Sequence, residues 1–177
     1  MILSDFDLRS YIASGRLYIE PFWEGIVREN GLDLRLGSEV CEMLGSDKPL
    51  DPYGEWDPSE YFKCYETNGV FQTKPWGRYL MHTLEYIRLP PELAGFVELR
   101  STFARLGFII PPTLIDGGFE GQLTIEVQAP PFPVSLRAGT RFLHVILSKV
   151  STPIERPYRG AYQGQRGVRL PKKLEYP

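Results

Sequence analysis

The sequence has 177 residues, a length that favours one domain, and we expect residues 1–177 to fold as a single unit. Its formal net charge of −2 disfavours nonspecific nucleic-acid binding by the surface as a whole. No apolar run approaches the roughly 20 residues of a membrane span, so we expect neither a nucleic acid nor a membrane as a partner.

The N-terminal residues predict one short helix. Ser4 followed by Asp7 is typical of a capping box, Leu8 and Tyr11 share a helical face, and Gly15 supplies a stop. The same segment is acidic where a secretory signal would need basic residues before a long apolar stretch. We therefore expect a cytoplasmic protein.

Beyond this helix the sequence predicts a mainly β protein. Its 16 prolines and 17 glycines punctuate short apolar stretches and leave no room for a long amphipathic helix. Many short strands joined by such turns favour a distorted antiparallel β-barrel or a jelly-roll-like sandwich. The expected strands are residues 17–19, 32–36, 70–72, 79–87, 96–100, 108–110, 122–128, 134–136 and 140–150.

Asp33 belongs to the first long strand. Leu32 and Leu34 are expected to face the core, so Asp33 faces away from it. The commonest interpretation of such a residue is a solvated carboxylate paired with Arg28 or Arg35.

Residues 44–65 are polar, turn-rich and aromatic. This composition suits an excursion over the surface, where it can help to cover a site, better than a part of the sheet. Cys41 and Cys64 are far apart in the sequence and have no histidine or second cysteine pair nearby. We predict neither a disulfide framework nor a zinc site, and we expect two buried or idle thiols.

The stretch LRSTFARLG carries a cluster suited to phosphate. Arg100 and Arg105 bracket Ser101 and Thr102, so one compact turn presents two cations, two hydroxyl groups and backbone N–H groups. A capped helical turn with exposed arginines would have the same pattern, and that alternative stays open.

The stretch DGGFEGQLTIE places a flexible Gly-Gly corner between Asp116 and the expected strand 122–128, which contains Glu126. Strand alternation sends Leu123 and Ile125 to the core and Thr124 and Glu126 to the other face. An ordinary surface strand has the same alternation.

The C-terminal residues 156–177 combine glycine, proline and basic residues with Tyr158 and Tyr162. We expect little regular structure there until the segment docks on something. A disordered terminus or a single-stranded nucleic-acid contact would fit the same composition.

Together, the blocks RSTFARLG, PPTLIDGGFEGQLTIE, RFLHVILSK and YRGAYQGQRGV resemble the dCTP deaminase family of archaeal type, within the dUTPase-like superfamily. The resemblance implies a homotrimer with the dUTPase-like fold and nucleotide sites between neighbouring subunits. It also implies that residues 156–177 close over the nucleotide. Two departures from the family are Ala161, where a lysine is missing, and His144, where related enzymes often hold glutamine; we expect His144 to pack along its strand.

The implied activity is deamination of dCTP to dUTP and ammonia, which supplies a precursor of thymidylate. Glu126 would be the catalytic carboxylate that accepts and returns protons. The zinc signature of other nucleobase deaminases, H-x-E with P-C-x-x-C, is missing from this sequence, so we predict activation of water without zinc, with Ser101 and Arg105 as the other catalytic residues. The alternatives are a dUTP diphosphatase and a bifunctional dCTP deaminase/dUTPase.

The resemblance also implies a set of nucleotide-binding residues. Asp116 would hold the deoxyribose, and no residue would bind a metal directly. Mg²⁺ would arrive with the triphosphate of dCTP and meet Asp33 only through water. The implied binding residues are Arg100, Ser101, Thr102, Phe103, Ala104, Arg105, Asp116, Thr124, Ile125, Glu126, Tyr158, Tyr162 and Gln165.

Overall fold

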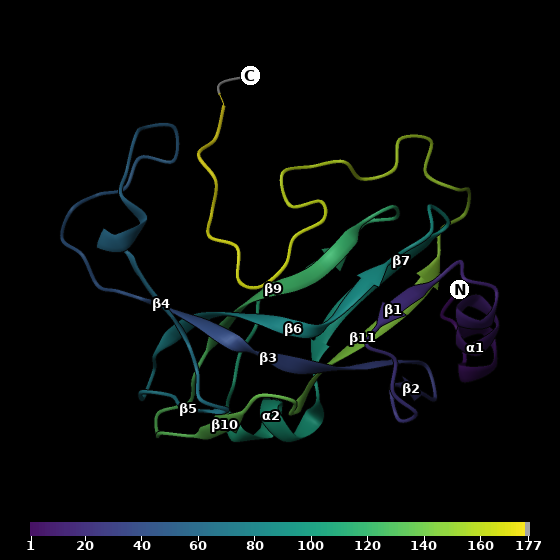
Figure 1. The fold of residues 1–177 in the computed structure, drawn as a ribbon, viewed down its shortest axis with the longest axis horizontal. Coiled ribbons are helices and arrows are strands. Elements are labelled where there is room, and N and C mark those ends of the chain that lie inside the picture. Colours follow the sequence, from purple (N-terminus) through teal and green to yellow (C-terminus); the bar gives the residue numbers. More distant parts are fainter. Residues whose placement is uncertain (176–177) are drawn as a thin grey trace.

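A computed structural model of the chain describes residues 1–175, and most of its regular structure is antiparallel β-sheet (Figure 1). Positions 176–177, at the end of the predicted C-terminal segment, lie outside the described residues. The helices are α1 (Asp5–Ala13), α2 (Ser101–Leu106) and the 3-10 turn η1 (Pro58–Glu60). The strands are β1 (Tyr18–Glu20), β2 (Val27–Arg28), β3 (Gly31–Met43), β4 (Phe62–Glu66), β5 (Val70–Gln72), β6 (Arg78–Arg88), β7 (Leu93–Leu99), β8 (Thr113–Ile115), β9 (Glu120–Gln128), β10 (Ser135–Arg137) and β11 (Arg141–Lys149).

The main sheet curls because its long strands change partners along their length. Its path is β1-β6-β3-β11-β7-β8, with β9 paired to β6 and both β2 and β4 paired to β3. The register shifts between Leu36 and Val40 of β3, and again between His82 and Tyr86 of β6. Such irregularities bend a strand and increase its twist, so the antiparallel sheet curls, as expected of the predicted distorted barrel.

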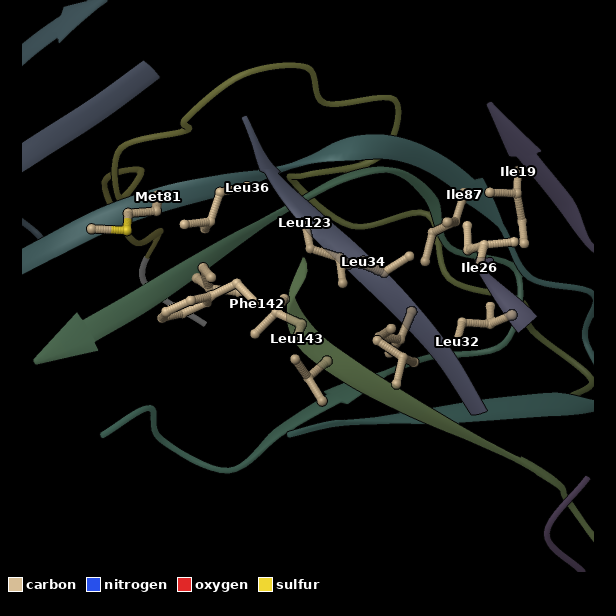
Figure 2. Packing of buried hydrophobic residues seen from close by; sticks show 14 of the residues in the cluster. Ile19, Ile26, Leu32, Leu34, Leu36, Met81, Ile87, Leu123, Phe142 and Leu143 are labelled. Atoms are coloured by element: carbon tan, nitrogen blue, oxygen red, sulfur yellow. The ribbon is translucent and has the colours of Figure 1, made fainter. Parts of the chain in front are cut away.

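The core lies inside this curl, where aliphatic side chains from several strands point toward one another (Figure 2). In β9 the buried positions alternate as predicted, so the apolar side chains face the core and the polar ones face outward. Leu34 of β3 and Phe142 of β11 are completely buried. The sheet therefore fixes the outward direction of the β9 polar face.

The N-terminal helix forms as predicted. Ser4 accepts a hydrogen bond from the backbone N–H of Asp7, and the Asp7 carboxylate accepts one from the backbone of Ser4. Leu8 and Tyr11 are buried beneath the helix. Within residues 1–175 no helix is long and apolar enough to cross a membrane.

Two strand predictions are wrong. Residues 108–110 form no strand, and only Ile109 makes an isolated bridge, to Gln128 of β9. Conversely, the last part of residues 44–65, which were predicted as a surface excursion, belongs to the sheet. Residues Phe62–Glu66 form strand β4, which pairs with β3. Only Phe62 and Tyr65 of this edge strand are partly buried, and its other side chains are exposed, so its composition resembles that of a loop.

The prediction of two unpaired thiols is also wrong. Cys41 and Cys64 are direct partners in the β3–β4 register and form a disulfide, with Cα atoms 3.9 Å apart. The two residues meet because the excursion between them is a long connection that returns the chain antiparallel to β3.

Candidate nucleotide-binding site

A pocket of about 370 Å³ lies between β8, β9 and the C-terminal segment. In Figure 1 the C-terminal segment, in yellow, crosses over β9 above this part of the sheet. The pocket brings together residues from both ends of the DGGFEGQLTIE stretch and from the C-terminal segment. The predicted binding residues that line it are Asp116, Thr124, Ile125, Glu126, Tyr158, Tyr162 and Gln165.

The Gly-Gly corner positions Asp116 and also receives the C-terminal segment. The backbone N–H of Phe119 donates to the carbonyl of Asp116 (3.1 Å), which closes the turn. Gly118 has a φ of 89°, and a Cβ there would lie 3.0 Å from the backbone N of Tyr158. The Tyr158 N–H donates to the Gly117 carbonyl (2.9 Å), so the corner holds the C-terminal segment by its backbone.

Glu126 lies near the end of β9 with its side chain exposed. It lines the pocket and also a neighbouring depression of about 310 Å³, which includes Arg78 and Ile109. Glu126 is therefore shared by the linings of two hollows.

The polar face of β9 holds the C-terminal segment in place. The Gln165 amide Nε2 donates to the Gln122 carbonyl (2.6 Å), and the N–H of Arg169 donates to Thr124 Oγ1 (3.0 Å). Because a carbonyl can only accept, Nε2 of Gln165 must face Gln122. The Gln165 Oε1 is then left as a buried oxygen with no hydrogen-bond partner among residues 1–175.

Tyr86 supports the same segment from β6. Its hydroxyl donates to Glu120 (2.8 Å), and the Arg166 guanidinium lies over its ring, 4.4 Å from the centroid. Burial raises the pKa of the Tyr86 phenol above its ordinary value, and the hydrogen bond to Glu120 raises it further.

The predicted phosphate cluster lies elsewhere in this chain. Residues Arg100–Arg105, in and before α2, are not among the residues that line the pocket, and α2 lies at the opposite side of the sheet in Figure 1. The Phe103 ring packs on Phe142 (centroids 4.6 Å apart), which anchors the helix to the core. Ser101, Thr102, Ala104 and Arg105 are exposed, and within residues 1–175 the side chain of Arg105 forms no ion pair.

Asp33 is buried, so the prediction of a solvated carboxylate is wrong. It is only 1% exposed, and its Oδ2 lies 3.4 Å from Arg100, 3.7 Å from Arg141 and 4.0 Å from Arg28. His144 lies 3.1 Å from its Oδ1. The register brings these side chains together from strands that are distant in the sequence, so Asp33 anchors Arg100 at the start of α2.

These surroundings do not fit a magnesium ion. Three guanidinium groups and the His144 ring surround the Asp33 carboxylate, and the charges of the guanidinium groups would repel a divalent cation. Among residues 1–175 no group of three or more His, Cys, Asp or Glu side chains could hold a metal ion.

Several residues of the site were missed by the sequence analysis. Phe119 and Arg169 line the pocket, while Gln122 and Glu39 hold the C-terminal segment above it. Gln122 shares the outward face of β9 with Thr124 and Glu126, so the alternation contained a signal for it. Glu39 had no such signal, because its role depends on a contact 129 residues away in the chain.

The fold and the pocket define a class of curled β-sheet protein with a pocket lined in part by its own C-terminal segment. A dCTP deaminase-like family model matches residues 2–150. The dCTP deaminase of Aeropyrum pernix is 55% identical over 172 residues, which cover 97% of this chain and 96% of that protein. The chain belongs to the dCTP deaminase-like family.

Solved structures agree on the fold. The 2'-deoxycytidine 5'-triphosphate deaminase from Agrobacterium tumefaciens has a TM-score of 0.65 at 21% identity, over 82% of this chain and 46% of that chain. A mutant dUTPase of Staphylococcus bacteriophage 80alpha has a TM-score of 0.50 at 11% identity, over 81% of this chain and 96% of that chain. The predicted mainly β, dUTPase-like fold is confirmed.

Proposed function

We propose that the protein deaminates dCTP to dUTP and ammonia. One observation carries the proposal: Asp116 and Glu126 line the same pocket, and Tyr158, Tyr162 and Gln165 line it from the C-terminal segment. Membership in the dCTP deaminase-like family supports the same activity.

Glu126 is the proton carrier in this proposal. Hydrolysis at C4 of cytosine adds water, protonates N3 and releases the amino group as ammonia. A carboxylate that accepts a proton from the attacking water and passes it to N3, and then takes the remaining hydroxyl proton to the leaving amine, serves each step in turn. The exposed position of Glu126 at the wall of the pocket supports this role.

Asp116 and Gln165 would orient the nucleotide. A carboxylate at the glycine corner can accept the proton of the 3'-hydroxyl of deoxyribose. The unpartnered Oε1 of Gln165 is an acceptor, so it suits an amino group at C4 better than the carbonyl oxygen of uracil. The Gln165 contact favours dCTP over dUTP, whereas the Asp116 contact is to a sugar that both nucleotides share.

We propose that a neighbouring subunit completes the site. Ser101, Thr102 and Arg105 are exposed on α2 and do not line this chain's pocket, yet their chemistry suits a triphosphate and a water. In a homotrimer, α2 of one subunit can meet the pocket of the next. Phe103 and Ala104 would then contribute through the backbone, and Arg100 would bind phosphate from its position beside Asp33.

We propose further that the reaction needs no zinc and that dCTP binds as its magnesium complex. The cation would be held by phosphate oxygens and water, since the surroundings of Asp33 are cationic. A cytoplasmic location stays a prediction.

The decisive test is product analysis after separate incubations with dCTP and dUTP. Ammonia and dUTP from dCTP, without pyrophosphate, support a deaminase. Pyrophosphate and dUMP from dUTP alone would contradict the proposal and favour a dUTP diphosphatase. Both sets of products would identify a bifunctional enzyme.

Glu126→Gln tests the proton carrier. The substitution keeps the shape of the side chain and removes its basicity, so we expect ammonia release to fall by at least about 10³-fold. Binding of dCTP, measured by calorimetry, should remain within about tenfold of wild type. Turnover near the wild-type rate would reject the assignment.

A further inference from the structure

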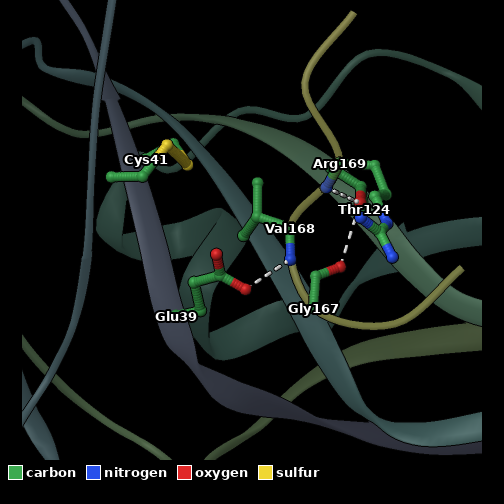
Figure 3. Close-up of a disulfide and its surroundings, with 7 residues drawn as sticks. Glu39, Cys41, Thr124, Gly167, Val168 and Arg169 are labelled. Atoms are coloured by element: carbon green, nitrogen blue, oxygen red, sulfur yellow. Dashed lines mark hydrogen bonds between the residues drawn. A yellow bond between two sulfur atoms is a disulfide. The ribbon is translucent and has the colours of Figure 1, made fainter. Parts of the chain in front are cut away.

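Glu39 lies in β3, outside the lining of the pocket, and contacts the C-terminal segment directly. Its Oε2 accepts a hydrogen bond from the backbone N–H of Val168 (2.9 Å), as Figure 3 shows. A Cβ on Gly167 would clash with the same oxygen, and Gly167 has a φ of 66°. The carboxylate therefore fits closely against a glycine that turns the chain.

The neighbouring contacts fix residues 167–169 from a second strand. The Gly167 N–H donates to Gln122 Oε1 (2.6 Å), and the Arg169 N–H donates to Thr124 Oγ1 (3.0 Å). The Val168 side chain is 8% exposed and packs against Cys41 and Leu80. The backbone N–H groups of three successive residues are thus all bound to the sheet. Those of Gly167 and Arg169 donate to side chains of β9, and that of Val168 donates to a side chain of β3.

Glu39 itself is held in position by His82. The Glu39 backbone N–H donates to His82 Nε2 (3.3 Å), while His82 Nδ1 lies 2.9 Å from the Thr83 carbonyl. A carbonyl only accepts, so Nδ1 carries the proton and Nε2 is the acceptor. Among residues 1–175 the Glu39 carboxylate forms no ion pair, which leaves its charge to strengthen the bond from Val168.

The fixed stretch, residues 167–169, ends with Arg169 and begins two residues after Gln165, and both of these residues line the pocket. From this geometry we infer that Glu39 is a positioning residue, a latch that keeps the C-terminal segment closed over the pocket. The inference rests on the proposed function, in which this segment covers bound dCTP.

The latch predicts a specific kinetic signature. Only the closed form binds dCTP fully, so the apparent affinity falls in proportion to the closed fraction, while the rate at saturation is unchanged. For Glu39→Ala we expect KM for dCTP to rise about tenfold, equivalent to about 1.4 kcal/mol. The kcat should stay within about twofold of wild type.

Limited trypsin digestion without nucleotide gives a second readout that needs no activity. Arg166 and Arg169 lie in or beside the latched stretch, and their cleavage in Glu39→Ala should be about tenfold faster than in wild type. Glu39→Gln keeps an oxygen that accepts from Val168, so it should restore most of the protection. Glu66→Ala is the matched control, because Glu66 is the register partner of Glu39 on β4 and, within residues 1–175, makes no hydrogen bond to the segment.

Gly167→Ala provides a test with Glu39 intact. The added Cβ overlaps the carboxylate and strains a positive φ, so the same rise in KM and in cleavage is expected even if Glu39→Ala folds poorly. Wild-type KM and cleavage in both variants would overturn the latch, as would faster cleavage with an unchanged KM. If no protein, wild type included, deaminates dCTP, the proposed function fails, while the cleavage rates still decide whether Glu39 holds the segment.

Discussion

Side chains on the outward face of β9 divide between two tasks. Gln122 and Thr124 bind the backbone of the C-terminal segment, whereas Glu126, one alternation further on, faces the pocket. The alternation of apolar and polar residues made this face predictable. The surroundings of Asp33 were not predictable, because its basic neighbours come from two other strands, β2 and β11, and from the start of α2.

At the same scale, Tyr86 predicts an alkaline pH dependence. Its pKa is raised in the folded state, so the folded protein prefers the neutral phenol. The resulting stability is fully present below pH of about 10 and is lost as the pH rises through the folded-state value. In urea denaturation, Tyr86→Phe should cost about 1 kcal/mol at pH 7, through the lost bond to Glu120, and this difference should shrink above pH of about 10. A difference that grows with pH would contradict this account.

Strand β4 is the element on which the sequence prediction and the structure differ most. Its polar composition hid an edge strand, and the disulfide of Cys41 with Cys64 was hidden with it. The helix α1 and strands such as β5 and β9 were predictable, because capping residues and strict alternation are local signals. A strand whose identity depends on a distant partner has no local signal.

Removal of this disulfide should lower stability. It closes a loop with a sequence separation of 23, for which the chain-entropy relation gives about 3 kcal/mol. We expect Cys64→Ser to lose about that much free energy of unfolding in urea at fixed protein concentration. Wild type in dithiothreitol should match the variant, and the variant itself should not respond to the reductant. A wild type that is equally stable with and without reductant would contradict the prediction.

On the scale of the whole molecule, the chain separates its proposed catalytic parts. Glu126 and Asp116 line the pocket, but α2, with Ser101 and Arg105, does not. Sequence order could not predict this separation, because the blocks RSTFARLG and DGGFEGQLTIE are close in the chain. A cyclic homotrimer would bring the parts together between subunits.

Subunit mixing tests this arrangement. Glu126→Gln and Arg105→Ala should each be almost inactive alone. After co-refolding in equal amounts, about one quarter of the sites should combine an intact Glu126 with an intact Arg105 from the next subunit. We therefore expect ammonia release near one quarter of the wild-type rate. A mixture as inactive as its components would show that the two residues act within one chain.

The geometry of strand β3 restricts changes in its length. Asp33 in the arginine cluster, Glu39 under Val168 and Cys41 in the disulfide all belong to this one strand, with a register shift between Leu36 and Val40. Losing or gaining a single amino acid between the first two would turn one of them to the wrong side of the sheet. We therefore expect natural variants of this strand to differ by substitutions and not by insertions or deletions. The spacing of these three positions along the chain should stay constant even where the residue types change.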